Sequence, residues 1–256
     1  MNRALYAKSL SDHRRGLTGW AVGTAAVATM YASTYPSQKD STANLPEAMR
    51  EAMHIDASAA GYLQASVFGL ILPLLAMVYG VATGTRAVAA DEEAGQLDLI
   101  LAHPVPRTRL VLQRFAALAT GALVIAFPVW LAMLAIRDSA ELTSVTPGQL
   151  LAQCTNLALL SIVFGALAIA LGAGYGRRVP VLVTAAVIGV LAYAAHTFAG
   201  QLGADWLAYL SPFHYYIAGQ PLRHGFQWGD AAVLVGMAAA LVGAAIMRLN
   251  SRDLRS

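Results

Sequence analysis

Six apolar runs, separated by short polar segments, constrain the fold of this chain more than any other feature of its sequence. A helix needs about 20 mostly apolar residues to cross the hydrocarbon core of a bilayer, and inside lipid its backbone groups must be bonded internally. The chain is 57% hydrophobic and 12% charged, whereas about a quarter of the residues of a soluble domain are charged. We therefore expect an all-α, polytopic membrane protein with six transmembrane helices. The predicted spans cover about residues 16–35, 60–84, 110–136, 150–174, 179–199 and 231–247.

The positions of the basic residues predict which side of the membrane each segment faces. If both termini are cytoplasmic, all but four of the 17 Lys and Arg residues fall in inner segments, as the positive-inside rule requires. Residues 1–15 are then a basic, weakly amphipathic N-terminal segment, residues 16–247 the transmembrane domain, and residues 248–256 a basic cytoplasmic tail. A cleaved signal peptide is the alternative at the N-terminus, but the first apolar run is long enough to span.

A polar segment, residues 85–107, separates the second and third predicted spans. Within it Leu97, Ile100 and Leu101 recur at helical spacing and form one apolar face. Pro104 ends this pattern, because the residue before a proline is pushed out of the α region. A short helix with one apolar face, placed between two spans, either lies on the lipid surface or docks against a soluble partner. The residue pattern by itself leaves both interpretations open.

This segment resembles the cytoplasmic loop between the second and third spans of the permeases of type-2 ATP-binding-cassette (ABC) exporters. The shared pattern is the acidic pair Glu92-Glu93, then Gly95, a leucine-rich turn at residues 97–101, and a Pro-Val-x-Arg end in which Pro106 replaces the usual serine. In that family the loop is a coupling helix that contacts the ATPase subunit. The resemblance therefore implies a coupling role for Glu92, Glu93, Gly95, Leu97, Leu101, Pro104 and Arg107.

The resemblance covers nearly the whole chain, so it also implies an activity and partners. A half-size permease of this class works with a second permease chain, as a homodimer or heterodimer, and with a separate ABC ATPase that binds ATP and Mg. Residues 1–15 would be an elbow helix on the inner membrane face. The expected function is export of a lipophilic drug, antibiotic or lipid through the inner (plasma) membrane.

Residues 200–230 are too interrupted by Gly and Pro to span the membrane, and they are rich in aromatic residues. Trp and Tyr favour the headgroup layer because an apolar ring carries a polar edge. We therefore expect short interfacial helices at the outer leaflet, and residues 210–216 also resemble the exporter family at this place. The candidate residues of this outer interfacial segment are Trp206, Pro212, Phe213, Tyr215 and Tyr216.

Small residues four positions apart recur in the predicted spans, and this spacing lets helix backbones approach closely. Packing within the chain is their ordinary role, although a dimer could use the same spacing. The pairs are Gly19 and Gly23, Gly80 and Gly84, Gly172 and Gly176, and Gly236 and Ala240. Of these, Gly19, Gly23, Gly172 and Gly176 are our candidate helix-packing residues.

Two absences from the sequence indicate where the energy for transport comes from. The chain contains no Gly-Lys pair and therefore no phosphate-binding loop of the usual kind. No predicted span carries an acidic or basic residue near its centre, whereas ion-driven carriers usually need one. We therefore expect a transporter subunit that is not itself an enzyme and holds no cofactor.

The single cysteine, Cys154, argues against a cysteine-based metal site, and the basic residues form no patch for nucleic acid.

Two other functions stay open as alternatives. The Glu92-Glu93 pair would suit a membrane-embedded hydrolase or protease, but it lies in a polar loop and no arginine follows nearby. A non-transport membrane scaffold or sensor would need none of the coupling pattern. Association with an ATPase separates a transporter subunit from both.

Overall fold

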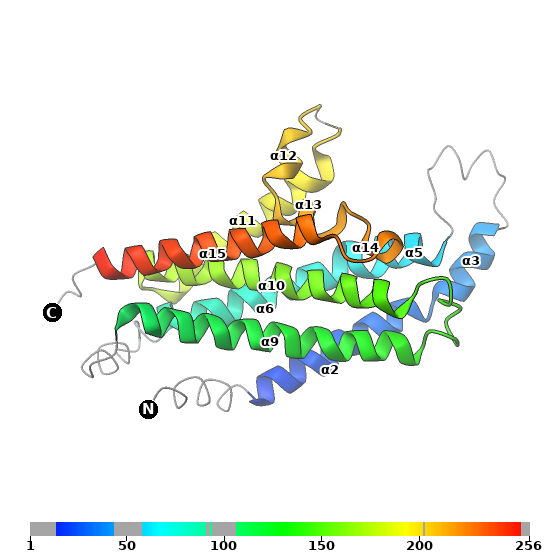
Figure 1. Cartoon of the computed structure of the whole chain (residues 1–256), viewed down its shortest axis with the longest axis horizontal. Coiled ribbons are helices and arrows are strands. Elements are labelled where there is room, and N and C mark those ends of the chain that lie inside the picture. The colour runs from blue at the N-terminus through cyan, green and yellow to red at the C-terminus, as the bar shows by residue number, and fades with distance from the viewer. Residues whose placement is uncertain (1–13, 44–57, 91–92, 94–105, 202, 252–256) are drawn as a thin grey trace.

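The computed structural model describes residues 14–43, 58–90, 93, 106–201 and 203–251. Within these residues the regular elements are all helices, so the predicted all-α class is confirmed (Figure 1). The first part of the chain forms α2 (Arg14–Ala32) and α3 (Tyr35–Ala43). The next helical stretch consists of α5 (Ala59–Tyr62), η1 (Leu63–Ile71), α6 (Leu72–Thr85) and η2 (Arg86–Ala90). The remaining elements are α9 (Arg107–Ala135), α10 (Pro147–Tyr175), α11 (Arg178–Phe198), α12 (Trp206–Tyr209), α13 (Pro212–Ile217), α14 (Pro221–His224) and α15 (Trp228–Ser251).

Five helices of the described chain are long and apolar enough to cross a membrane, and the protein is a multi-pass membrane protein. They are Ala59–Ala89, Arg107–Ala135, Pro147–Tyr175, Arg178–Phe198 and Trp228–Ser251. Each of them overlaps one of the last five predicted spans. The first predicted span, residues 16–35, corresponds to α2, which has 19 residues and begins with two arginines. Because α2 is less apolar than these five helices, a membrane span at residues 16–35 stays a prediction.

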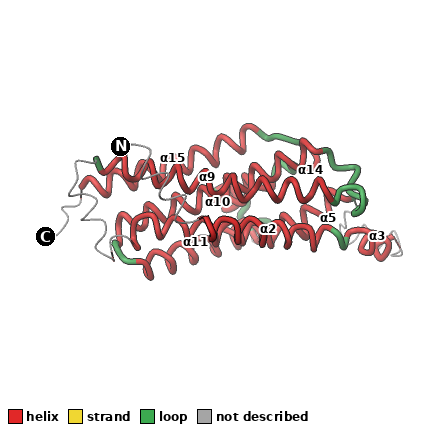
Figure 2. Tube along the Cα trace, turned by 90° about the horizontal axis from the view of Figure 1, so that it is seen from below, coloured by secondary structure: helices red, strands yellow, loops and turns green. Residues whose placement is uncertain are grey.

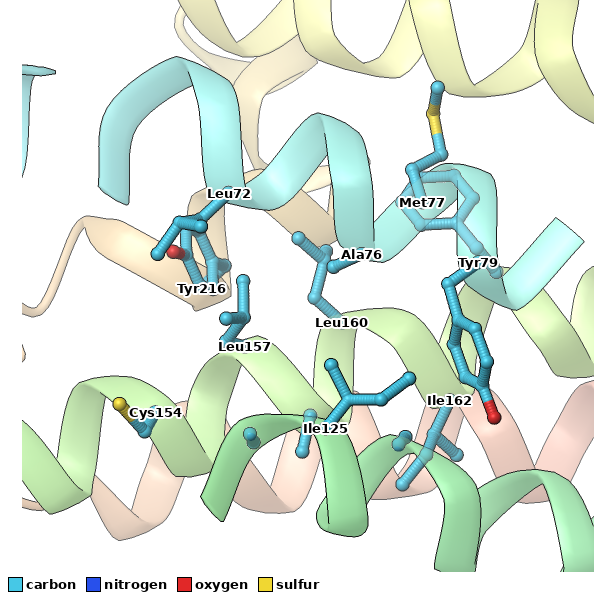
Figure 3. Close-up of a cluster of buried hydrophobic side chains, with 14 of the residues drawn as sticks. Leu72, Ala76, Met77, Tyr79, Ile125, Cys154, Leu157, Leu160, Ile162 and Tyr216 are labelled. Atoms are coloured by element: carbon cyan, nitrogen blue, oxygen red, sulfur yellow. The ribbon is translucent and has the colours of Figure 1, made fainter. Parts of the chain in front are cut away.

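The long helices run side by side, and α10 lies in the middle of the bundle (Figures 1 and 2). In the most apolar stretch of α10, 72% of the residues are buried, whereas in that of α11 only 17% of the residues are buried. α10 packs against α6, α9, α15 and α11. A helix that is apolar on all sides belongs in the interior of such a bundle, and the apolar core therefore surrounds α10. Figure 3 shows part of this core, including Leu72, Leu157 and Leu160.

Polar contacts between sequence-distant segments define two opposite ends of the bundle. At one end Lys39 forms an ion pair with Glu141 at 2.7 Å, and the Gln149 amide donates to the Arg223 carbonyl at 2.6 Å. We call this the Lys39 end. At the other end the Arg178 backbone N–H donates to Glu93, and we call it the Glu93 end. The long helices run alternately from one end to the other (Figure 1).

Glycines bring the backbones of α6 and α10 into contact. A Cβ atom at Gly80 would overlap the carbonyl oxygen of Ser161, and one at Gly84 would overlap the carbonyl oxygen of Gly165. Beside them the Ser161 hydroxyl donates to the Ala76 carbonyl at 2.9 Å. Close approach of this kind is how helices pack in lipid, where no hydrophobic force drives them together. The small-residue spacing at Gly80 and Gly84 thus fixes the α6–α10 contact.

The other glycine pairs are placed differently. A Cβ atom at Gly172 would make ordinary contact with Ala89, at 3.4 Å from its backbone nitrogen, and Gly176 ends α10 in the left-handed conformation with φ 64°. Gly19 and Gly23 have open space in front of them within the described chain. Of our four candidates, Gly172 therefore packs within the chain, Gly176 terminates a helix, and Gly19 and Gly23 lie on an uncovered face of α2.

Pro73 is preceded by irregular helical turns. A proline has no N–H and its ring clashes with the carbonyl four residues earlier, so a regular α-helix cannot pass through it unchanged. The preceding segment η1 is a π-helix, in which the Leu72 N–H bonds to the Val67 carbonyl. The Gly69 carbonyl, four residues before Pro73, accepts a hydrogen bond from the Tyr193 hydroxyl of α11 at 3.3 Å. The irregular turns therefore give α11 a polar contact in the bundle.

Candidate functional site

Glu93 caps a helix that is far from it in sequence. The first turn of α11 has N–H groups without partners in the helix, as every helix start does. Its N-cap residue, Arg177, makes no side-chain cap, and Pro180 has no N–H to offer. The Arg178 N–H instead donates to Glu93 Oε2 at 2.9 Å. A carboxylate is also favoured there because the helix dipole is positive at the N-terminus.

Arg107 makes the complementary contact at the end of another helix. It begins α9, and its Nη1 atom donates to the Leu249 carbonyl oxygen at 2.8 Å. Leu249 lies in the last turn of α15, where carbonyls lack partners within the helix and a positive charge is favoured. Thus Glu93 and Arg107, which flank residues 94–106, bind the termini of α11 and α15.

Of the seven predicted coupling residues, the structure describes these two. Glu92, Gly95, Leu97, Leu101 and Pro104 lie outside the described residues. Glu93 is exposed and Arg107 is partly buried, and both lie at the Glu93 end of the bundle. The sequence pattern identified the two residues. It gave no signal for Arg178 or Leu249, because each binds through a backbone atom.

The polypeptide just before Glu93 is fixed by apolar packing. Ala89 of η2, Ala168 of α10 and Val181 of α11 form a small buried cluster, each with 0% exposure. Gly172 lies beside Ala89 in the same region. A displacement of this segment would therefore act directly on α10 and α11.

We predict that Glu93→Ala loosens the first turn of α11. Loss of a side-chain cap removes a charge-assisted hydrogen bond, so amide exchange at Arg178 should become roughly threefold to tenfold faster. Hydrogen-exchange mass spectrometry of the purified chain measures this. Glu93→Gln keeps a hydrogen-bond acceptor but loses the charge. Its exchange rate at Arg178 should therefore lie between the rates of the wild type and of Glu93→Ala. Glu92→Ala is the matched control, and an equal effect from that variant would contradict the cap.

The outer interfacial candidates divide between the surface and the core of the bundle. Trp206 is 63% exposed, and Tyr215 is partly buried with its hydroxyl donating to the Tyr209 carbonyl at 3.0 Å. Pro212 begins α13, whose first turn is capped by the Ser211 hydroxyl. Phe213 and Tyr216 are each 1% exposed. The predicted short helices are therefore present as α12, α13 and α14, and α13 packs its aromatic residues into the bundle.

A small cavity lies between α2, α6, α9 and α10. Its volume is about 20 Å³, and Trp20, Tyr79, Ile125 and Ser161 are among its lining residues. The Trp20 and Tyr79 rings meet edge to face at 5.7 Å beside it. Such a volume holds about one water molecule, so in this conformation the cavity is no chamber for a drug-sized ligand. Among the described residues, no group of three or more His, Cys, Asp or Glu side chains could hold a metal ion.

Comparison with known proteins identifies the family. A search of curated proteins found no match to the chain. The family described as "Multidrug efflux system permease Rv1217c, C-terminal domain" matches residues 7–249. The match includes the long helices except the last two residues of α15, both glycine contacts of α6, and the contacts of Glu93 and Arg107. It confirms the resemblance to efflux permeases, and a permease acts in membrane transport. The chain therefore belongs to the family of the C-terminal domain of the multidrug efflux system permease Rv1217c.

Proposed function

We propose that this chain is the permease subunit of an ATP-driven type-2 ABC exporter in the inner (plasma) membrane, and that it moves lipophilic compounds out of the cell. The observation that carries the proposal is the match to a multidrug efflux permease over residues 7–249. The coupling pattern at residues 92–107 and the lack of a phosphate-binding loop add to it. A separate ATPase would bind ATP and Mg.

In this proposal the ATPase docks at the Glu93 end. ATP binding closes the ATPase pair and displaces the segment between Glu93 and Arg107. Because these two residues bind the ends of α11 and α15, the displacement reaches both helices as well as α6 and α9. Glu93, exposed and bonded to a backbone N–H, fits this role better than that of the buried acid of an intramembrane hydrolase.

A second permease chain, identical or related, completes the pathway in this proposal. Two uncovered apolar surfaces support it. On α11, Val183, Val187 and Leu191 are 51–62% exposed, and on α2 the Gly19 and Gly23 face is open. The mass of the complex purified with its ATPase should correspond to two permease and two ATPase chains.

We further propose six spans with both termini in the cytoplasm, so that the Lys39 end faces outward. The alternating direction of the long helices and the basic residues of the Glu93 end support this orientation. Single cysteines in a Cys154→Ala background test it with a membrane-impermeant maleimide. Exposed positions Ser139 and Asp205 should react in intact cells, and exposed positions Gly174 and Ser251 only after permeabilisation. Reaction of Gly174→Cys in intact cells would exclude the orientation.

Reconstitution tests the function directly. The purified chain should hydrolyse no ATP above a blank, because it lacks a phosphate-binding loop. Together with its ATPase, in inside-out vesicles, it should accumulate ethidium only when Mg-ATP is present. A Walker-lysine variant of the ATPase is the control for ATP dependence. Hydrolysis by the pure permease, or accumulation without ATP, would refute the assignment.

A further inference from the structure

Between positions 153 and 161 of α10, the Thr, Asn and Ser side chains have a hydrogen-bond partner in the described chain, and the Gln side chain has none. The Thr155 hydroxyl donates to the Leu151 carbonyl at 2.8 Å, and the Ser161 hydroxyl to the Ala76 carbonyl. The Asn156 amide donates to the Tyr216 carbonyl of α13 at 3.2 Å. Gln153 is 0% exposed, yet neither its Oε1 nor its Nε2 atom has a hydrogen-bond partner among the described residues.

Tyr216 presents a second buried group of the same kind. Its ring lies in the apolar core with Leu72 and Leu157 (Figure 3), and its hydroxyl has no hydrogen-bond partner among the described residues. The Gln153 side chain and the Tyr216 hydroxyl interact with each other, but their contact does not have the geometry of a full hydrogen bond. Burial raises the pKa of Tyr216 well above its ordinary value of 10, so the hydroxyl stays protonated and able to donate.

These groups are costly in a core of this kind. A buried donor or acceptor without a partner destabilises a fold, whereas apolar groups of the same shape would not. Polar side chains inside a membrane domain are functional candidates by default. An amide and a protonated hydroxyl are both neutral, and no charged side chain is buried among the described residues. The pair therefore suits a neutral donor or acceptor group such as an amine, hydroxyl or amide.

α13, which itself carries Tyr216, packs against α10 through a limited set of contacts. The Asn156 amide binds the Tyr216 carbonyl, and the Gln64 amide donates to the Ile217 carbonyl at 3.3 Å. The Phe213 ring packs 5.4 Å from Phe164 and 5.3 Å from Tyr193 between ring centroids. Both hydrogen bonds end on carbonyls in the last turn of a six-residue helix. A shift of α13 away from α10 would separate Tyr216 from Gln153 and open space between these two polar groups.

We propose that the Gln153 amide and the Tyr216 hydroxyl form a hydrogen-bonding subsite for the transported molecule, reached when α13 moves away from α10. This inference rests on the proposed export function. It assigns the binding of a polar group on an otherwise lipophilic cargo to two named side chains near the Lys39 end. The polar groups are then unpaired in the closed state because their partner is the cargo.

Two probes and three variants test the subsite. Ethidium carries two aromatic amines, whereas tetraphenylphosphonium is a lipophilic cation with no hydrogen-bonding group. Gln153→Met and Tyr216→Phe remove the polar atoms at nearly constant shape. Asn156→Leu is the matched control, because its amide has a protein partner. The measurements are thermal unfolding of the purified chain and ATP-dependent uptake of each cation into inside-out vesicles.

We expect Gln153→Met and Tyr216→Phe to unfold at the wild-type temperature or about 2 °C higher, because an unpaired group is removed. Each should lower kcat/KM for ethidium by about threefold to tenfold, chiefly through KM, and leave tetraphenylphosphonium unchanged. Asn156→Leu should unfold at a lower temperature.

Two results would overturn the subsite alone. One is an unfolding temperature for Gln153→Met as low as that of Asn156→Leu, which would mean that the amide has a structural partner. The other is an unchanged preference between the two cations in both variants. If wild-type vesicles export tetraphenylphosphonium but not ethidium, the subsite is refuted while export stands. If they export neither cation, the proposed cargo class fails together with the subsite.

Discussion

Leu101→Asp should abolish export and the co-purification of the ATPase, while the protein stays in the membrane at the wild-type level. In the sequence pattern Leu97 and Leu101 share the apolar face of the predicted coupling helix. Loss of a buried apolar anchor of an interface often costs more than about 2 kcal/mol, which weakens binding by at least about 30-fold. Pull-down of the tagged ATPase from solubilised membranes, scaled to permease content, measures the effect.

The control for this variant lies two residues away. Leu99→Asp introduces the same charge, but position 99 is on the opposite side of a helix from position 101. It should retain most of the ATPase. A helix that only lies on lipid would respond differently, since Leu101→Asp would then weaken membrane attachment and leave the ATPase bound. Wild-type pull-down and export by Leu101→Asp would remove the coupling role from this segment.

Gly80→Ala should be one of the most destabilising single-methyl changes in the described membrane helices, together with Gly84→Ala. The added Cβ would overlap the Ser161 carbonyl oxygen and lie 3.0 Å from the Gly165 nitrogen, and both are backbone atoms that cannot rotate away. Overpacking of a core typically costs about 1–3 kcal/mol, and a rigid obstacle places this change near about 3 kcal/mol. We expect a fall of roughly 6–10 °C in the unfolding temperature of the purified chain.

Gly19→Ala, Gly23→Ala and Gly236→Ala are matched controls, because a Cβ at each would meet nothing within 4 Å in the described chain. Their unfolding temperatures should equal that of the wild type or exceed it slightly, since alanine is the better helix former. If Gly19→Ala instead lowers the mass of the complex, its face contacts a second chain. An unfolding temperature for Gly80→Ala equal to that of the controls would contradict the close α6–α10 contact.

Local patterns determined the positions of the long helices, because span length and hydropathy depend only on neighbouring residues. α10 begins at Pro147 after a capping box between Thr146 and Gln149, and it ends at Gly176 in the left-handed conformation. Its predicted bounds, residues 150–174, differ from the observed ones by only a few positions. The breaks in residues 200–230 likewise predicted the short helices α12, α13 and α14. Where hydropathy is weaker, as in α2, the sequence pattern alone does not decide the span.

The roles of individual side chains depended on the tertiary structure. Gly19–Gly23 and Gly80–Gly84 have the same spacing, but only the second pair faces another backbone, because spacing does not specify which helix lies opposite. The acidic pair was visible in the sequence, whereas the partner of Glu93 is a backbone N–H 85 residues away. Asn156 and Gln153 are both amides of α10, but the position of α13 gives Asn156 a hydrogen-bond partner and leaves Gln153 without one. Periodicity and composition thus determined which segments cross the bundle, and the packing of distant helices determined which residues are available for coupling and binding.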